Sequence, residues 1–239
     1  MKLDSENLIN EMTEAGLHYG HSRTYTHPKA AAFLVKGNNP IGIIDLEITK
    51  THLEEALNVI IDTIKKKGLI LFVGTTPGAK NLIRDLAQKY GYPYVNERWL
   101  GGTLTNFKTL SQRIKTLEQL EEDEKSGKWE EYTKKERVHL YKELDSLQKK
   151  FAGLRKLTKL PDLLVVIDTG THKTAVHEAR KLDIPVVGVL DNDDDPTLIN
   201  YPVPANDSAK SSIAFILDKI EEAIIEGQKA QIVKEIISE

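Results

Sequence analysis

Aspartates follow two apolar stretches of the sequence, in DTGTHK (168–173) and DNDDDP (191–196). Open parallel sheets bind their ligands at the carboxyl ends of the strands, so a site is expected at such positions. Carboxylate oxygens are the ligands that hard cations such as Mg²⁺ prefer. The second segment therefore predicts either a weakly bound divalent cation or a polar loop with solvated carboxylates. The candidate ligands are Asp191, Asp195 and Asp207, with Asp193 and Asp194 beside them.

Covalent chemistry is an alternative for the first of these segments. An apolar stretch, then Asp168, then Gly-Thr after one further residue is similar to the aspartyl-phosphate loop of haloacid-dehalogenase-type phosphatases. The aspartate is the nucleophile in that chemistry, and a second acid two positions on usually moves the proton. Gly170 occupies that position here. The usual acid/base is therefore absent. A metal-dependent phosphatase using Asp168 is still kept as the alternative function, because it would explain the aspartates at the strand ends.

A third segment, GTTPGAKN (74–81), has glycines and a lysine after an apolar stretch. A phosphate-binding P-loop needs the pattern G-x-x-x-x-G-K-[ST]. Gly74 and Gly78 are one residue too close for it, and Lys80 does not directly follow the second glycine. We interpret this segment as a turn from a strand into a helix, with Pro77 near the first helical position.

Aromatic and cationic residues alternate in HYGHSRTYTHPK (18–29). Two histidines three apart are a weak signal for zinc, because the chain has no cysteine to complete the site. Aromatic rings interleaved with cations suit stacking on bases and contact with phosphates. The segment is therefore either an RNA-binding surface or an ordinary loop that covers the core. The candidate RNA contacts are His18, Tyr19, His21, Arg23 and Lys29.

The segment NERWLGGTLTNF (96–107) joins a short apolar stretch to a long helical one. Arg98 offers a planar fork for phosphate, and Trp99 offers either a stacking face for RNA or an anchor in the core. Gly101 and Gly102 would let the chain leave a sheet and enter a helix without a clash, as a hinge.

Short apolar stretches alternate with amphipathic ones along most of the chain. This alternation favours a parallel sheet covered on both faces, and we predict an α/β fold with a doubly wound, flavodoxin-like sheet. Thr51 with Glu54 forms a capping-box pattern at the start of one helix. The expected strands are 41–46, 69–74, 92–95, 163–167, 186–190 and 201–203; the expected helices are 5–15, 52–67, 79–90, 173–182 and 208–226.

Residues 104–156 interrupt this alternation, because their apolar residues recur three and four apart among charged ones. The pattern is typical of an antiparallel coiled-coil hairpin. Two arrangements are open for the hairpin: it can project from the body, or it can pack flat on the sheet as a lid. Its apolar seam is narrow, which favours projection. We predict a globular α/β domain of residues 1–103 and 157–239 with this hairpin inserted, and a return helix capped by Thr133 with Glu136. At its tip, Trp129 and Tyr132 are candidate protein-binding residues.

The 239 residues include 33 basic and 36 acidic side chains, for a formal net charge of −3. A protein coated in nucleic acid is disfavoured by this balance, but a local basic surface is not. The absence of cysteine excludes disulfides and a cysteine zinc site. The first residues lack the apolar core of a secretory signal, and no apolar run is long enough to span a bilayer, so a cytoplasmic protein is expected.

Four stretches together resemble the bacterial-type S-two family of small-subunit ribosomal proteins. They are GLHYGHSRTYTHPK, LILFVGTTPGAKN, NERWLGGTLTNFKT and LPDLLVVIDTGTHKTAVHEARKLDIPVVGVLDNDDDP. Their order and spacing match the family along nearly the whole chain. Two departures are Ala205, where the family usually has glycine, and the acidic residues 193–195 in place of more neutral ones.

The resemblance implies a structural, ribosome-bound protein in the cytoplasm rather than an enzyme. It implies contact with 16S-type rRNA between the head and body of the small subunit, with neighbouring ribosomal proteins, and help in anchoring the messenger-binding protein S-one. Neither a membrane nor a small-molecule substrate is expected, and no cofactor beyond the weak cation. A basic rim is expected near the N-terminal segment and the base of the hairpin, outweighed by acid elsewhere.

Overall fold

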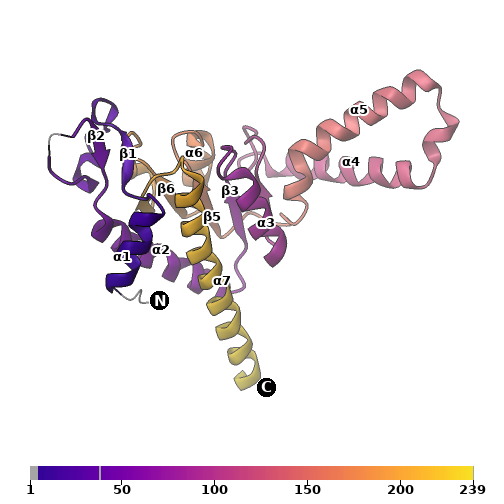
Figure 1. Ribbon diagram of the computed structural model, residues 1–239. Helices are drawn as coiled ribbons and strands as arrows, with labels where there is room; N and C mark the ends of the chain where they lie inside the picture. The colour runs from indigo at the N-terminus through magenta and orange to yellow at the C-terminus, as the bar shows by residue number, and fades with distance from the viewer. Residues whose placement is uncertain (1–4, 38, 239) are drawn as a thin grey trace.

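The computed structural model describes residues 5–37 and 39–238 (Figure 1). Its centre is a parallel sheet of five strands in the order β4-β3-β5-β6-β7. Counted within this sheet alone, the order is 2-1-3-4-5, which is the flavodoxin-like order, so the predicted fold class is confirmed. The strands are β3 (Ile70–Val73), β4 (Tyr94–Val95), β5 (Leu163–Ile167), β6 (Val186–Leu190) and β7 (Tyr201–Pro204).

Both faces of this sheet are buried, which explains why its strands read as continuous apolar runs. Phe72 lies opposite Tyr94 on one neighbouring strand and Val165 on the other, and its side chain faces one layer of core. Leu71 and Val73 face the other layer, because successive side chains of a strand alternate. The first layer is covered by α1 (Ser5–Glu14), α2 (Leu46–Lys65), α3 (Lys80–Tyr90) and α7 (Lys210–Ser238), and the second by α6 (Lys173–Lys181).

Helix α2 starts earlier than the sequence pattern indicated. Asp45 caps it, with a side-chain oxygen accepting from the backbone N–H of Glu47 at 3.0 Å. Thr51, the predicted cap, lies inside the helix and donates to the carbonyl of Glu47. The prediction was wrong because threonine and aspartate are both good caps, and both Asp45 and Thr51 stand near the beginning of α2.

Helix α7 continues well beyond residue 226, where we expected it to end. Gly227, the first residue beyond the expected end, lies inside the helix and serves close packing between helices. A Cβ at Gly227 would come within 2.9 Å of the Cβ of Ile64 on α2. Glycine therefore lets α7 lie close against α2.

A second, two-stranded sheet lies outside the main one. β1 (Tyr19–Ser22) and β2 (Ile41–Ile43) pair antiparallel, with Tyr19 opposite Ile43. The expected strand at 41–46 is thus shorter and belongs to this small sheet, and β1 was not expected at all. Short 3₁₀ helices complete the chain at Arg23–Tyr25, Ala30–Phe33, Lys128–Glu131, Ala152–Leu154 and Pro196–Leu198.

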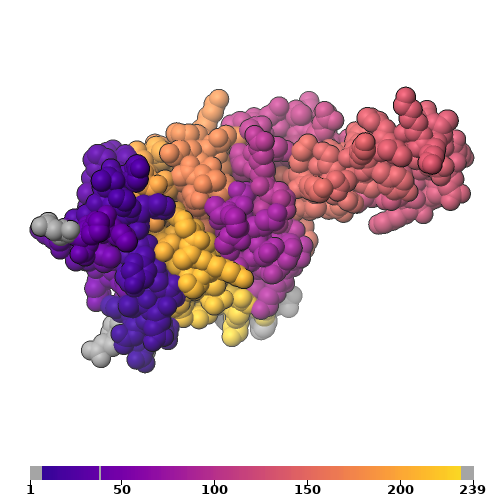
Figure 2. Space-filling view, turned by 45° about the horizontal axis from the view of Figure 1, so that its top comes forward, coloured from indigo at the N-terminus to yellow at the C-terminus, as the bar shows by residue number. Residues whose placement is uncertain are grey.

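Helices α4 (Phe107–Lys125) and α5 (Lys134–Phe151) form a hairpin that projects from the body, as Figures 1 and 2 show. The predicted capping box is confirmed, with both Thr133 and Glu136 bonding to each other's backbone. Supercoiling of the two helices and the division into domains stay predictions. The buried seam comprises Leu110, Ile114, Leu117, Leu144, Leu147 and Phe151.

Within the part of the chain that the structure describes, no helix is both long and apolar enough to pass through a membrane.

Candidate functional site

The loop between β4 and α4 is held by one buried carboxylate, Glu178 on α6. Its Oε1 accepts from the Trp99 indole Nε1 at 3.1 Å and from the Gly102 backbone N–H at 2.8 Å. Its Oε2 accepts from the backbone N–H groups of Leu104 and Thr105, at 2.9 and 3.0 Å, and from the Thr105 hydroxyl at 3.1 Å. This carboxylate therefore ties the hairpin to the sheet. We call Glu178 and the hydrogen bonds that it accepts the Glu178 clasp.

Burial alone would raise the pKa of Glu178, but the hydrogen bonds from Thr105, Trp99 and the loop backbone lower it overall. The group is therefore a carboxylate at neutral pH. Sequence reasoning missed it because its partners lie more than 70 positions away. The only local signal was an acid among the inward-facing positions of a short amphipathic helix.

The Glu178 clasp gives the two predicted RNA contacts of this loop, Arg98 and Trp99, different environments. Trp99 is half-buried and bound to Glu178, so it anchors the loop, whereas Arg98 is exposed. Gly102 has φ +89°, in the left-handed region that favours glycine, and its N–H is one of the clasp donors. Gly101 has no atom within 4 Å of a Cβ built on it, so only Gly102 requires glycine here.

The residues of the N-terminal segment are placed on and around β1. Tyr19 is 52% exposed, with its ring 4.0 Å from the ring of His18. One Arg23 nitrogen donates to the carbonyl of Val35 at 2.6 Å, so part of its guanidinium is used within the protein. Lys29 is exposed and lies 3.3 Å from the hydroxyl of Thr197. These side chains form a mixed aromatic and cationic edge.

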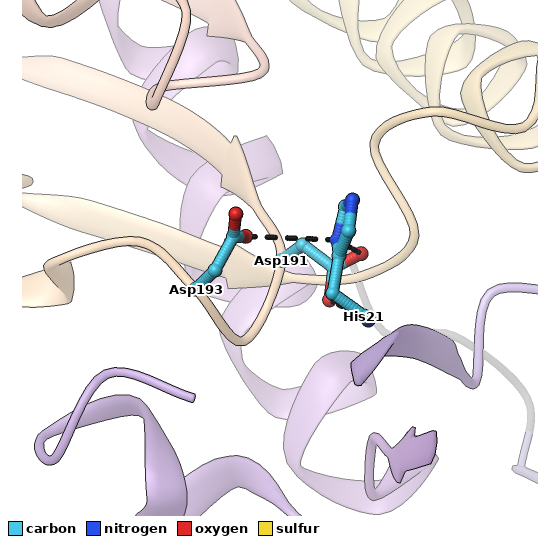
Figure 3. A group of neighbouring side chains, drawn as sticks. All are labelled: His21, Asp191 and Asp193. Carbon is cyan, nitrogen blue, oxygen red and sulfur yellow. Dashed lines mark hydrogen bonds and ion pairs between the residues drawn. The ribbon is translucent and has the colours of Figure 1, made fainter. Parts of the chain in front are cut away.

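His21 belongs to an acidic group rather than to this edge. Figure 3 shows it beside two carboxylates that follow β6, with its Nδ1 2.8 Å from Asp191 and 3.6 Å from Asp193. Burial lowers the pKa of His21, but attraction to the two aspartates outweighs this and raises it overall. A protonated imidazole explains the contacts. A neutral imidazole with two carboxylates could instead coordinate a cation.

A second acidic group lies at the carboxyl ends of the strands, where Asp168, Asp194 and Asp207 bring one oxygen each within 4.8 Å of the others. Asp195 is in neither group, because its carboxylate caps the turn at Thr197. The predicted set of Asp191, Asp195 and Asp207 is therefore not one cluster in the described residues. A weakly bound divalent cation stays a prediction, with its donors now divided between the two groups.

Burial and mutual repulsion raise pKa values in this second acidic group. Burial, together with repulsion from the nearby carboxylates of Asp168, Asp191 and Asp194, raises the pKa of Asp207 to about 8. The pKa of Asp194 is raised as well, first by burial. Among the described residues, the negative charges of this group are therefore not balanced by nearby positive charges.

Asp168, the nucleophile of the alternative function, is folded back onto its own loop. Its two carboxylate oxygens accept from the backbone N–H and the hydroxyl of Thr171, at 2.8 and 2.7 Å. The residue has φ +64°. This is the geometry of an Asp-led turn, which explains an aspartate at this position without catalysis.

Of the two aromatic residues predicted at the tip of the hairpin, only Tyr132 is exposed. Trp129 is only 4% exposed and packs edge-on against Tyr141, with ring centroids 4.9 Å apart. Tyr132 is 42% exposed. A partner at the tip would meet Tyr132 and Tyr141, while Trp129 holds the tip together. Protein binding by the tip stays a prediction.

Charge divides the hairpin sharply. Its base, residues 98–117 and 146–161, carries nine Lys and Arg and no Asp or Glu. Its outer part, residues 118–145, carries ten Asp and Glu against six Lys and Arg. Phosphate contacts need cations, so the base is the part of the hairpin suited to RNA. It is separated from the other predicted RNA surface, because the small β1–β2 sheet and the hairpin lie on opposite sides of the molecule (Figure 1).

Comparison with known proteins identifies the family. The family model described as ribosomal protein S2 matches residues 12–227. The chain belongs to the ribosomal protein S2 family. Relatives named small ribosomal subunit protein uS2 include that of Thermus thermophilus, 46% identical over 92% of this chain and 86% of that protein. That of Cereibacter sphaeroides is 44% identical over 93% and 88%, and that of Coprothermobacter proteolyticus is 41% identical over 93% and 83%.

Membership of the S2 family confirms the resemblance read from the sequence motifs. The comparisons give the phosphatase alternative no support. The match includes both the N-terminal edge and the hairpin, because it spans residues 12–227.

Proposed function

We propose that this chain is a structural constituent of the small ribosomal subunit rather than an enzyme. The match to the S2 family over residues 12–227 carries this proposal, together with relatives that are named as small-subunit proteins. Ribosome-bound and cytoplasmic, it binds 16S-type rRNA between the head and body of the subunit. Its other partners are neighbouring ribosomal proteins.

The distribution of charge supports contact with RNA in spite of the net charge of −3. The basic hairpin base and the exposed Arg98 form one face. The edge around Tyr19 and Lys29 forms a second face. Two separate faces that carry cations suit a protein that bridges two parts of a folded RNA, while the acidic outer hairpin faces solvent or protein.

The anchoring of an S-one messenger-binding protein is part of the proposal. The acidic outer hairpin and the exposed Tyr132 are the features on which it rests. Small subunits prepared from cells depleted of this chain are expected to carry less S-one protein.

Sedimentation tests the main proposal. The tagged chain is expected to move with small subunits on a sucrose gradient at the ionic strength of the growing cell. A chain recovered only as free protein at the top of the gradient would contradict the proposal. Removal of divalent cations, which unfolds ribosomal RNA, is the control that should release it.

A further inference from the structure

A hollow of about 200 Å³ lies where the hairpin leaves the body. It is bounded by α3, by the end of β4 and by the end of α5, and we call it the hairpin-base pocket. Its volume equals several waters at roughly 30 Å³ each. The long polar side chains that line it are Arg84, Asn96, Glu97, Gln148, Lys149 and Lys150.

The lining favours an anion. Arg84, Lys149 and Lys150 contribute cations, and the amide of Asn96 can donate hydrogen bonds. The amide nitrogen of Gln148 donates to Glu121 at 2.8 Å. Of the described residues that line the hollow, Glu97 is the one acid. Lys80 neutralises it at 2.6 Å. Among the described side chains that line the pocket, three cations therefore stand against one acid, which is itself neutralised.

The partners these cations have in the free protein are weak. Arg84 pairs with Asp85, the next residue along the chain, and Lys149 pairs with Asp145 one helical turn away. Both pairs are well exposed, and exposed ion pairs contribute only about 0–1 kcal/mol. Lys150 reaches only the hydroxyl of Ser146. An anion that met all three cations could replace these contacts at little cost.

The walls of the pocket are fixed in place. Gly153 lies in contact with the carbonyl oxygen of Tyr94, so closely that no side chain fits between the end of α5 and β4. The main-chain contact positions Lys149 and Lys150 one turn earlier relative to the sheet. A backbone held in place leaves only the side chains to be ordered on binding, which favours affinity.

We infer that the hairpin-base pocket holds one backbone phosphate of folded RNA, bound by Arg84 and by the Lys149–Lys150 pair. This inference rests on the proposed RNA-binding function and names where the RNA backbone enters. A planar guanidinium binds phosphate oxygens in pairs, and the two lysines add point charges. The contact positions the RNA and does not read its sequence.

The test compares two pairs of lysines on the same helix. The variants are Lys149→Gln with Lys150→Gln at the pocket, and Lys134→Gln with Lys135→Gln near the tip. Both remove two exposed positive charges, so the change in net charge is matched. Arg84→Gln is a third variant. Binding of a 16S-type rRNA transcript to the full chain is measured across a series of salt concentrations.

The pocket variants are expected to bind roughly tenfold more weakly, about the loss of one charge-assisted hydrogen bond. Their plot of log affinity against log salt should flatten by about one unit for each phosphate that the variant no longer binds. The tip variant should keep the slope of the unmodified chain. Equal weakening in both lysine variants, or unchanged slopes in all three, would overturn the inference while leaving RNA binding intact.

Two further arms separate the remaining outcomes. Equilibrium dialysis with inorganic phosphate alone should show no binding comparable to that of RNA; comparable binding would mean a small-anion site and overturn the assignment to RNA. Failure of the unmodified chain to bind the transcript and to move with small subunits would overturn the proposed function and this inference together. Circular dichroism of each variant checks that the fold is kept.

Discussion

At the scale of the residue, Glu178 shows how a single buried carboxylate can organise a loop. Four hydrogen-bond donors of the chain between β4 and α4 converge on it together with the indole of Trp99. A carboxylate has about four lone-pair positions, so these five donors fill them, with three of the donors sharing Oε2. The conformation of the loop is therefore set by α6 as much as by its own glycines.

We expect Glu178→Ala to lower the free energy of unfolding by roughly 1–3 kcal/mol or more, because buried donors are left without acceptors. Glu178→Gln should cost less, since one carbonyl oxygen remains. Chemical denaturation measures both. Because the pKa of Glu178 is lowered on folding, its contribution is present above the ordinary glutamate pKa of about 4.3 and is lost as pH falls through the folded value. A loss of stability independent of pH would argue against the clasp.

For Asp207 we expect the opposite dependence of stability on pH. Its pKa is raised to about 8 on folding, so the folded state binds its proton more tightly than the unfolded state, whose pKa is about 3.9. Its effect on stability therefore becomes less favourable as pH rises from about 4 to about 8. Asp207→Asn should remove this fall, which thermal unfolding at about pH 5 and about pH 8 would detect. An unchanged pH dependence in the variant would contradict the burial and repulsion that raise the pKa of Asp207.

At the scale of the element, close packing between helices decides where α7 runs. Gly227 faces Ile64 on α2 with room for a hydrogen only. The helix therefore passes through a residue that a local pattern marks as its end. The propensity cost of one glycine in a helix, about 1 kcal/mol, is small beside the packing of a long helix on its neighbour.

The same contact makes a prediction. Gly227→Leu is expected to destabilise the fold by about 1–3 kcal/mol, because an added side chain must displace α2. Gly101→Ala is the matched control, since a Cβ there meets open space, and it should leave the midpoint of denaturation nearly unchanged. Equal stability of the two variants would show that α7 can move away from α2 freely.

At the scale of the whole molecule, the arrangement of charge matters more than its sum. The net charge of −3 hides a basic hairpin base and an acidic outer hairpin. An association driven by phosphate contacts at the base should weaken steeply with salt, although the chain as a whole is acidic. A projecting arm also gives the molecule two distant faces, which one compact body of this size would not have (Figure 2).

Much of this architecture could be predicted from the sequence. The apolar strands identified a parallel sheet because both of its faces are buried, and the spacing of leucines identified the hairpin because each helix packs along one narrow stripe. Thr133 with Glu136 could be read directly, since a capping box is a contact between residues three apart. The family motifs could also be read, because they are short strings of residues in fixed order.

Other features were decided only by tertiary structure, because they depend on residues far apart in the chain. The clasp at Glu178 and the division of the aspartates into two groups both required distant segments to be brought together. Short-range patterns report period, caps and turns, which are local free energies. They do not say how close an aspartate after β6 lies to a histidine on β1, and that distance determines which charges meet.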